Sequence, residues 1–160
     1  MLFATLFSYV GLAQKEARPS PADSVSGKIG DANIKINYSS PSVKGRKIWG
    51  ELVPYNKVWR AGANEATTFQ TDKEIKVEGK PLPAGKYAFF AIPGEKEWTI
   101  IFNKVANQWG AFNYDASKDV ITAIVHPRNS NSMQERLSYG ITQQGIVLKW
   151  ENLEVPVSIK

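Results

Sequence analysis

The sequence predicts an all-β protein, an antiparallel β-sandwich of the jelly-roll or immunoglobulin-like kind with one or two short helical pieces. Three observations support this prediction. Apolar and polar residues alternate with period two in several short segments, turn-forming Gly, Pro and Asn residues separate these segments, and no long stretch repeats with a helical period. A length of 160 residues is typical of one domain with a sizeable core.

Strands are expected in order along the first half of the chain. Residues 33–38 alternate between polar and apolar side chains, as in a strand with one face in water. Residues 67–69 and 74–77 follow as strands, the second leading into the turn EGKPLPAG. Residues 86–92 (KYAFFAI) are apolar on both faces, which predicts a central strand between two layers.

The second half continues the same pattern. Residues 98–103 and 120–125 are predicted strands, and residues 127–135 (PRNSNSMQE) are predicted to form a polar loop. Residues 136–142 and 146–151 form a predicted hairpin, and the last residues alternate again. The predicted core contains Ile36, Phe69, Tyr87, Phe89, Trp98, Ile100, Leu148, Trp150 and Val157.

The composition excludes several classes of protein. The net charge of +5 is spread along the chain, unlike the basic patch of a nucleic-acid-binding protein. The absence of Cys excludes disulfides, thiol catalysis and metal–thiolate sites, and a single histidine, His126, excludes a multi-histidine metal site within one chain. No motif predicts a cofactor, and the sequence does not define an oligomeric state.

The N-terminal run of residues 2–13 is apolar and uncharged. Gly11 and Ala13 occupy the −3 and −1 positions of a signal-peptidase site, so residues 1–13 are interpreted as a signal peptide, 14–23 as a linker and 24–160 as one domain. A first core strand or an anchoring helix is the alternative interpretation. The run is too short for a transmembrane span, which takes ~20 residues, so we expect a periplasmic or secreted protein without one.

Residues 41–69 (PSVKGRKIWGELVPYNKVWRAGANEATTF) concentrate the side chains suited to recognition. The i,i+4 pairs within residues 48–53 permit a short helical turn. Residues 57–70 are predicted to form a hairpin that places Arg60 opposite Glu65. We expect this segment to line a concave patch with cationic donors, an amide and an aromatic wall. The candidate ligand-binding residues are Arg46, Trp49, Trp59, Arg60, Asn64 and Glu65.

A catalytic constellation is not evident. No nucleophile motif is present, and His126 is interpreted as a surface residue. Glu65 is the candidate acid or base of a glycan or peptide hydrolase, with Asp72, Glu74 or Asp115 as a second carboxylate. Oxygen-bearing side chains at alternate positions of residues 113–119 resemble a calcium loop, but the glycine and bidentate glutamate of such a loop are missing.

Three segments of the chain resemble a known family. They are residues 41–69, LPAGKYAFFAIPGEKEWTIIFNK and NQWGAFNYD, which together span most of residues 20–160. By these segments the chain resembles domain of unknown function family 2911, found mainly in exported proteins of Bacteroidetes-type bacteria. The resemblance implies export but no activity and no catalytic residues. The preferred hypothesis is therefore a binding module for a small anionic, glycan or peptide ligand of the cell envelope, with a hydrolase or a purely structural protein as alternatives.

Overall fold

The computed structural model describes residues 17–160, and the signal peptide expected at residues 1–13 lies outside that part. The described residues form an antiparallel β-structure, which confirms the predicted fold class. Its main sheet contains β1 (Ala22–Ile29), β2 (Ala32–Ser39), β3 (Thr67–Thr71), β6 (Gly85–Ile92), β7 (Trp98–Asn103) and β8 (Asp119–Val125), in that spatial order. No helix of the described residues is long and apolar enough to cross a membrane.

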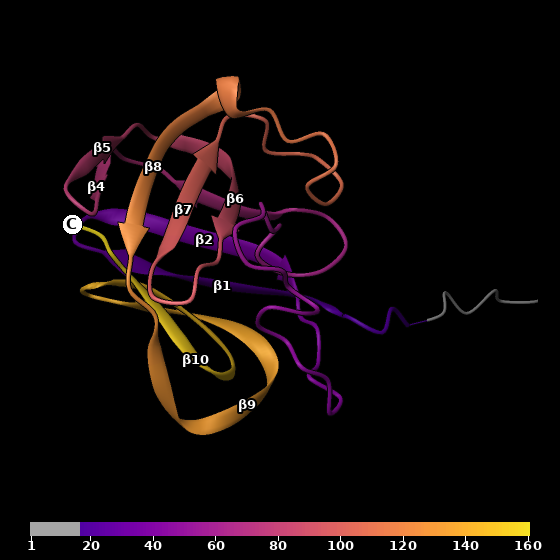
Figure 1. Cartoon of the computed structure of the whole chain (residues 1–160). Helices are drawn as coiled ribbons and strands as arrows, with labels where there is room; N and C mark the ends of the chain where they lie inside the picture. The colour runs from indigo at the N-terminus through magenta and orange to yellow at the C-terminus, as the bar shows by residue number, and fades with distance from the viewer. Residues whose placement is uncertain (1–16) are drawn as a thin grey trace, which may run out of the picture.

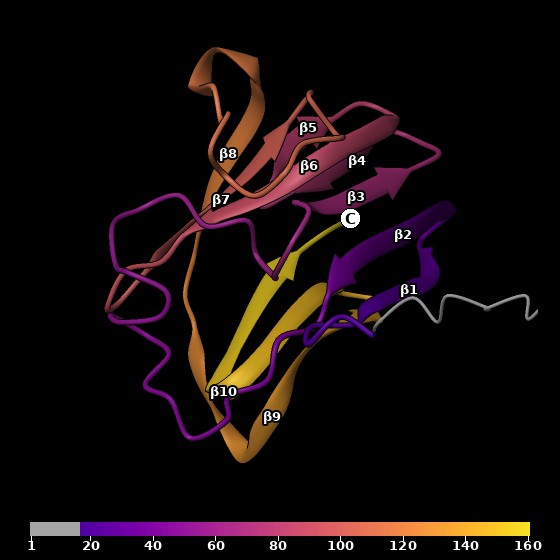
Figure 2. The same cartoon turned by 90° about the vertical axis from the view of Figure 1, so that its right-hand side faces the viewer.

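The second layer is a twisted two-stranded ribbon made of β9 (Arg128–Thr142) and β10 (Gly145–Ser158). A small hairpin of β4 (Ile75–Val77) and β5 (Lys80–Leu82) closes one end of the core. Figure 1 shows the main sheet above the β9–β10 ribbon, and Figure 2 shows the sheet curving around one side of that ribbon as far as β1 and β2. The curvature encloses the core between the two layers.

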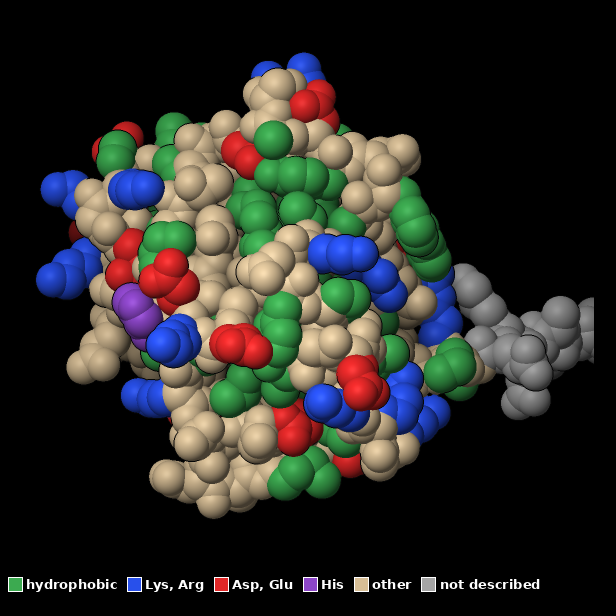
Figure 3. All heavy atoms as spheres, viewed as in Figure 1, with side chains coloured by type: hydrophobic (Ala, Val, Ile, Leu, Met, Phe, Trp, Pro, Cys, Tyr) green, Lys and Arg blue, Asp and Glu red, His purple; other side chains and the backbone are tan. Residues whose placement is uncertain are grey.

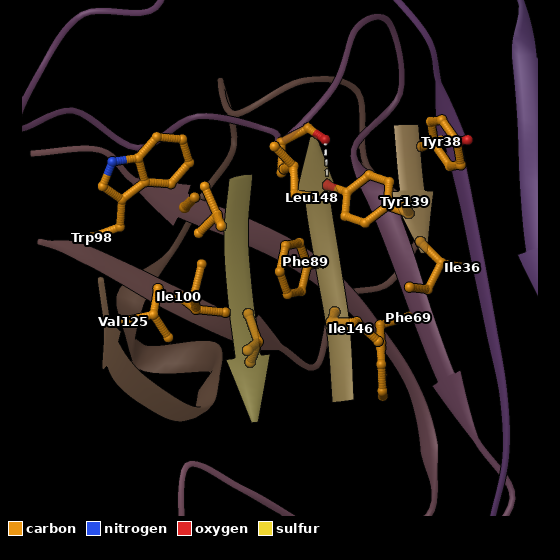
Figure 4. Packing of buried hydrophobic residues seen from close by; sticks show 14 of the residues in the cluster. Ile36, Tyr38, Phe69, Phe89, Trp98, Ile100, Val125, Tyr139, Ile146 and Leu148 are labelled. Atoms are coloured by element: carbon orange, nitrogen blue, oxygen red, sulfur yellow. Dashed lines mark hydrogen bonds between the residues drawn. The ribbon is translucent and has the colours of Figure 1, made fainter. Parts of the chain in front are cut away.

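The inner face of the main sheet follows from the alternation of its strands. Ile36 of β2 pairs in register with Val25 of β1 and with Phe69 of β3, and apolar side chains repeat at every second position along β2. Side chains at alternate positions of a strand share one face. This face lies against β9 and β10, and Figure 4 shows Phe89, Trp98 and Ile100 of the sheet near Leu148 and Tyr139 of the ribbon.

All nine predicted core residues are buried, which confirms that part of the sequence prediction. The strand predicted at residues 98–103 has the observed bounds of β7, and the strand predicted at 86–92 corresponds to β6 in the interior of the sheet. The apolar pattern on both faces of β6 has a structural reason. Its inner side chains enter the main core, whereas Ala88 and Phe90 on the other face pack in a second, smaller cluster.

The outer face of the sheet is divided into two halves. Over β6 and β7, residues 104–118 fold back and cover Ala88, Phe90 and Ile101 with the side chains of Ala111 and Tyr114. Over β1, β2 and β3, most outward side chains are polar and exposed, whereas Ser39 and Thr68 are buried. The covering segment therefore stands as a wall beside an open polar surface.

The predictions for residues 127–135 and for residues 48–53 were wrong. Residues 127–135 are not a loop but belong largely to β9, whose burial pattern lacks alternation there because most of these positions are exposed and the pairing with β10 shifts register. Residues 48–53 form turns closed by a bridge between Trp49 and Val53 rather than a helical turn. The described residues contain one short helical piece, the 3-10 helix η1 (Ala116–Lys118), which lies elsewhere.

Candidate functional site

The residues proposed from the sequence as one site lie in different environments. Arg46 serves its own turn, because its Nε donates to the Val43 carbonyl oxygen at 3.0 Å and its terminal nitrogen donates to the Ser42 carbonyl oxygen. The segment is tied to β9 through a bridge between Ser42 and Arg136. The Arg46 side chain therefore stabilises the backbone of its own turn.

Trp49 and Trp59 belong to the core. Their exposed fractions are 8% and 9%, and both pack with Trp98 and Trp150. Five pairs among these four indoles have centroids 5.0–6.1 Å apart. Most of these contacts are edge-on, an arrangement favoured by aromatic quadrupoles. The two rings leave little surface for the aromatic wall of a binding site.

The predicted cross-strand pair of Arg60 and Glu65 was wrong. Residues 57–70 do not form a local hairpin, because Trp59 pairs with Ala91 of β6 and Glu65 pairs with Trp109. The half-buried Arg60 forms no salt bridge with a described carboxylate, and burial lowers the pKa of its guanidinium. Arg60 and Glu65 therefore serve separate parts of the structure.

Glu65 instead pairs with Arg18, a residue that precedes β1. One terminal nitrogen of the Arg18 guanidinium lies 2.9 Å from Oε1 and 2.8 Å from Oε2 of Glu65. A hydrogen bond from its own backbone N–H and the bond from Arg18 lower the pKa of the Glu65 carboxyl group. Asn64, whose φ of +57° fits a turn, fixes the same region by donating from Nδ2 to the Ser20 carbonyl oxygen at 3.1 Å.

The Arg18–Glu65 pair borders a hollow on the open half of the outer face, with a volume of about 640 Å³. Its floor comes from β1, β2, β3 and β6, where Asn37 donates to the Thr68 hydroxyl at 3.4 Å. A smaller hollow of about 290 Å³ shares Glu65, Ala66 and Thr68 with it. We call the two hollows together the outer groove, lined among others by Arg18, Ser24, Asn37, Glu65, Thr68, Lys86, Asn107, Gln108 and Trp109.

Trp109 forms part of the wall of the outer groove, and its exposed fraction is 53%. Its backbone is held by hydrogen bonds between residues 64–66 and 108–110, from Gly110 N to Asn64 O at 3.1 Å and from Ala66 N to Gln108 O at 3.0 Å. The indole is thus exposed to water although its backbone is anchored. A large aromatic ring beside polar side chains is a common feature of small-molecule binding sites.

The remaining sequence candidates have structural roles. Asp115 caps η1 by accepting from the Ser117 backbone N–H at 2.9 Å, and Asp119 accepts from Asn103 Nδ2 at 2.8 Å. Within residues 17–160 no group of three His, Asp or Glu side chains is placed to hold a metal ion. His126 is exposed, with its Nε2 lying 3.8 Å from Glu97.

The candidate set drawn from the sequence did not include Arg18 or Trp109. Arg18 lies in the stretch interpreted as a linker, and nothing in the local pattern indicates its partner 47 residues away. Trp109 had a signal, because it lies in NQWGAFNYD among Gly and Asn residues rather than in an alternating strand. Of the predicted set, Glu65 lines the outer groove and Asn64 adjoins it.

The fold and the groove define a class of protein, a β-sandwich domain with a polar, aromatic-walled groove on the outer face of its main sheet. Residues 20–159 match the family described as Protein of unknown function (DUF2911). The chain belongs to this family, as its sequence segments indicated. No curated protein and no solved structure matches the chain.

Proposed function

We propose that this chain is a carbohydrate-binding module, and that a sugar ring binds in the outer groove against the face of Trp109. The observation that carries this proposal is the exposed indole of Trp109 beside a wall and floor of polar side chains. The indole face matches the apolar C–H face of a pyranose, and the surrounding amides, hydroxyls and charges match its ring of hydroxyl groups.

The composition of the groove favours a sugar over a small compact anion. Arg18 and Lys86 contribute positive charge, but the carboxylate of Glu65 lines the same hollow. A carboxylate can accept hydrogen bonds from sugar hydroxyls, and Arg18 and Asn37 can donate to them. Alternating donors and acceptors of this kind suit a ligand whose every hydroxyl both donates and accepts.

An exported location is part of the proposal. Its support is the apolar run at residues 2–13, which ends in a sequence suited to signal peptidase. Cleavage after Ala13 leaves Arg18 in the mature chain, so the Arg18–Glu65 pair would persist after processing. Mass spectrometry of the protein isolated from its native envelope tests this, and recovery of a cytoplasmic chain that retains residues 2–13 would refute it.

The hydrolase alternative receives less support from the geometry. A general acid at neutral pH requires a raised pKa, whereas hydrogen bonds lower the pKa of Glu65. Asp72 is held by Asn33 and Asp115 caps η1, and neither they nor Glu74 line the outer groove. The geometry therefore supports binding without turnover.

A glycan array identifies the sugars that the protein binds, and isothermal titration calorimetry with those sugars then tests the proposed site. We expect Trp109→Ala to reduce affinity by about tenfold or more, since stacked aromatic contacts contribute ~1–3 kcal/mol. Phe112→Ala is the matched control, because Phe112 is 83% exposed on the same loop yet does not line the groove. Equal loss in both variants, or binding unaffected by Trp109→Ala, would refute this site.

A further inference from the structure

We propose that the ligand is a linear acidic oligosaccharide that runs from Trp109 across the open half of the sheet to Lys28. This inference rests on the proposed function and specifies its ligand class. Such a ligand requires a path longer than the outer groove and positively charged side chains along that path.

The path exists because a further hollow lies on the same face of the sheet. This hollow has a volume of about 460 Å³ and is lined by side chains that include Ser26, Lys35 and Gln70. Each is two positions along its strand from a residue of the outer groove, namely Ser24, Asn37 and Thr68. Residues two apart on a strand share a face, so the hollows follow one another along the strands.

The length of this path suits several sugar units. Its ends are marked along the chain by Glu65, next to Trp109, and by Asp72, which lines the far hollow. Extended chain from Glu65 to Asp72 at ~3.3 Å per residue gives a path roughly 20 Å long. About four linked pyranose rings fill this length, whereas a monosaccharide would occupy only the Trp109 end.

The positive charge comes from three lysines on the outer face. Lys35 and Lys86 flank Gln70 in one row across the sheet, about 10 Å apart from the spacing of strands, and Lys28 lies in the far hollow with Lys35. None of the three forms a salt bridge with a carboxylate of the described residues. Asp72 is occupied by hydrogen bonds from Asn33. Spaced, unpaired ammonium groups match spaced carboxylates on a polymer.

A nucleic acid fits this surface less well. Phosphates occur at every nucleotide, and the path also carries the carboxylates of Glu65 and Asp72, which would repel those nearest to them. Single-stranded nucleic acids also need successive aromatic platforms, and Trp109 is the one exposed aromatic side chain that lines these hollows in the described part. Figure 3 shows a face of the molecule on which positive and negative side chains are interspersed. Interspersed charge alone therefore does not identify a binding surface, and the spacing of the lysines carries the argument.

Binding of the purified protein to linear glycans with and without uronic acids, from monosaccharide to hexasaccharide, tests the inference. The variants are Lys35→Gln, Lys86→Gln and Trp109→Ala. The matched control is Lys96→Gln, since Lys96 is an exposed lysine in the β6–β7 turn and does not line any of the three hollows. Single-stranded DNA is included as a competing anionic polymer.

We expect acidic glycans to bind more tightly than neutral ones, with affinity rising up to about the tetrasaccharide. Lys35→Gln and Lys86→Gln should each weaken binding of acidic glycans ~10-fold and reduce its salt dependence, and each should weaken binding of neutral glycans by a smaller factor. Trp109→Ala should weaken both kinds, and Lys96→Gln should weaken neither.

Each other outcome has a defined meaning. Short neutral glycans that bind as well as long acidic ones, with dependence on Trp109, would overturn this inference and leave the proposed function standing. Binding of no glycan would overturn both. Binding of single-stranded DNA as tight as that of the best acidic glycan, with the same dependence on Lys35 and Lys86, would identify the path as a nucleic-acid surface and overturn the inference.

Discussion

The Arg18 guanidinium donates to both carboxylate oxygens of Glu65, at 2.9 Å and 2.8 Å, and so joins the segment before β1 to the loop before β3. Both side chains are about half exposed. Solvent screens such a pair, and the side chains lose rotamer entropy on pairing. The pair therefore orients the Glu65 carboxylate in the groove more than it stabilises the fold.

This relationship predicts a small coupling energy. A double-mutant cycle with Arg18→Ala and Glu65→Ala should give a coupling of ~0.2–1 kcal/mol in urea unfolding at low salt, and less at high salt. A coupling above ~2 kcal/mol would show that the pair is a main structural support of the fold.

The pH dependence of the same carboxylate provides a second prediction. Because its folded-state pKa lies below the usual 4.5, Glu65 contributes stability that is present above pH 4.5 and is lost as the pH falls through the folded-state pKa. The stability gap between the wild type and Glu65→Gln should be constant between about pH 6 and 8 and shrink below about pH 4. Urea unfolding of both proteins across this range measures the gap, and a gap that widens in acid would contradict the assignment.

A third prediction contrasts two tryptophans. Trp150 is 1% exposed within the indole cluster, so Trp150→Ala should lower the free energy of unfolding by ~3–5 kcal/mol. Trp109→Ala should change it by less than ~0.5 kcal/mol, since its ring is exposed. Chemical denaturation compares them, and a loss below ~1 kcal/mol for Trp150→Ala would mean that the ring lies at the surface.

Tyr38 carries a fourth prediction. Burial and the hydrogen bond from its hydroxyl to Asp23 Oδ2, 3.0 Å long, raise its pKa to about 12. The neutral form is therefore favoured in the folded state, and its contribution to stability is complete below pH 10 and lost as the pH rises toward 12. The ultraviolet titration curve of Tyr38→Phe should lack one tyrosinate transition near pH 12 that the wild type shows. If the transition that the variant lacks lies near pH 10, the burial of this hydroxyl would be contradicted.

Gly145 at the β9–β10 turn gives a fifth prediction. A Cβ atom there would lie 2.0 Å from the Val157 carbonyl oxygen and 2.9 Å from the Ile159 nitrogen, both of them backbone atoms. Gly145→Ala should therefore cost at least ~3 kcal/mol, because backbone yields less than a side chain. Gly30→Ala is the control, since Gly30 has a φ of +56° but open space around it, and its cost should stay at ~1–2 kcal/mol. If both substitutions lowered the free energy of unfolding equally, the backbone at Val157 and Ile159 would have moved to make room for the new Cβ atom.

The strands that could be predicted from the sequence are those with one buried and one exposed face, or with two buried faces. Alternation in β2 marks the inner positions Ile34 and Ile36, and the apolar run of β6 marks a strand covered on both sides. These signals depend on burial, which acts on each residue locally. Residues 127–135 lacked them because much of β9 is exposed on both sides of a two-stranded ribbon.

The site could be predicted only in part because its contacts are between distant segments. Glu65 was a candidate, but its partners are Arg18 and the backbone of Trp109, and pairing at such separations leaves no periodic mark. The local hairpin expected for residues 57–70 was a reasonable alternative on turn chemistry. Pairing with β6 and with residues 108–110 prevailed because it buries Trp59 and Ala66.

The indole cluster has an optical consequence. Five pairs among its four rings have centroids 5.0–6.1 Å apart and are close enough for their excited states to couple, so the folded protein should show an exciton pattern in its circular dichroism that vanishes on unfolding. From their burial, these four indoles should emit like tryptophan in an apolar medium, whereas the exposed Trp109 should emit like an indole in water. Iodide should quench the Trp109 component alone, and a sugar seated on that ring should protect it, so the protein carries its own fluorescent reporter of ligand binding.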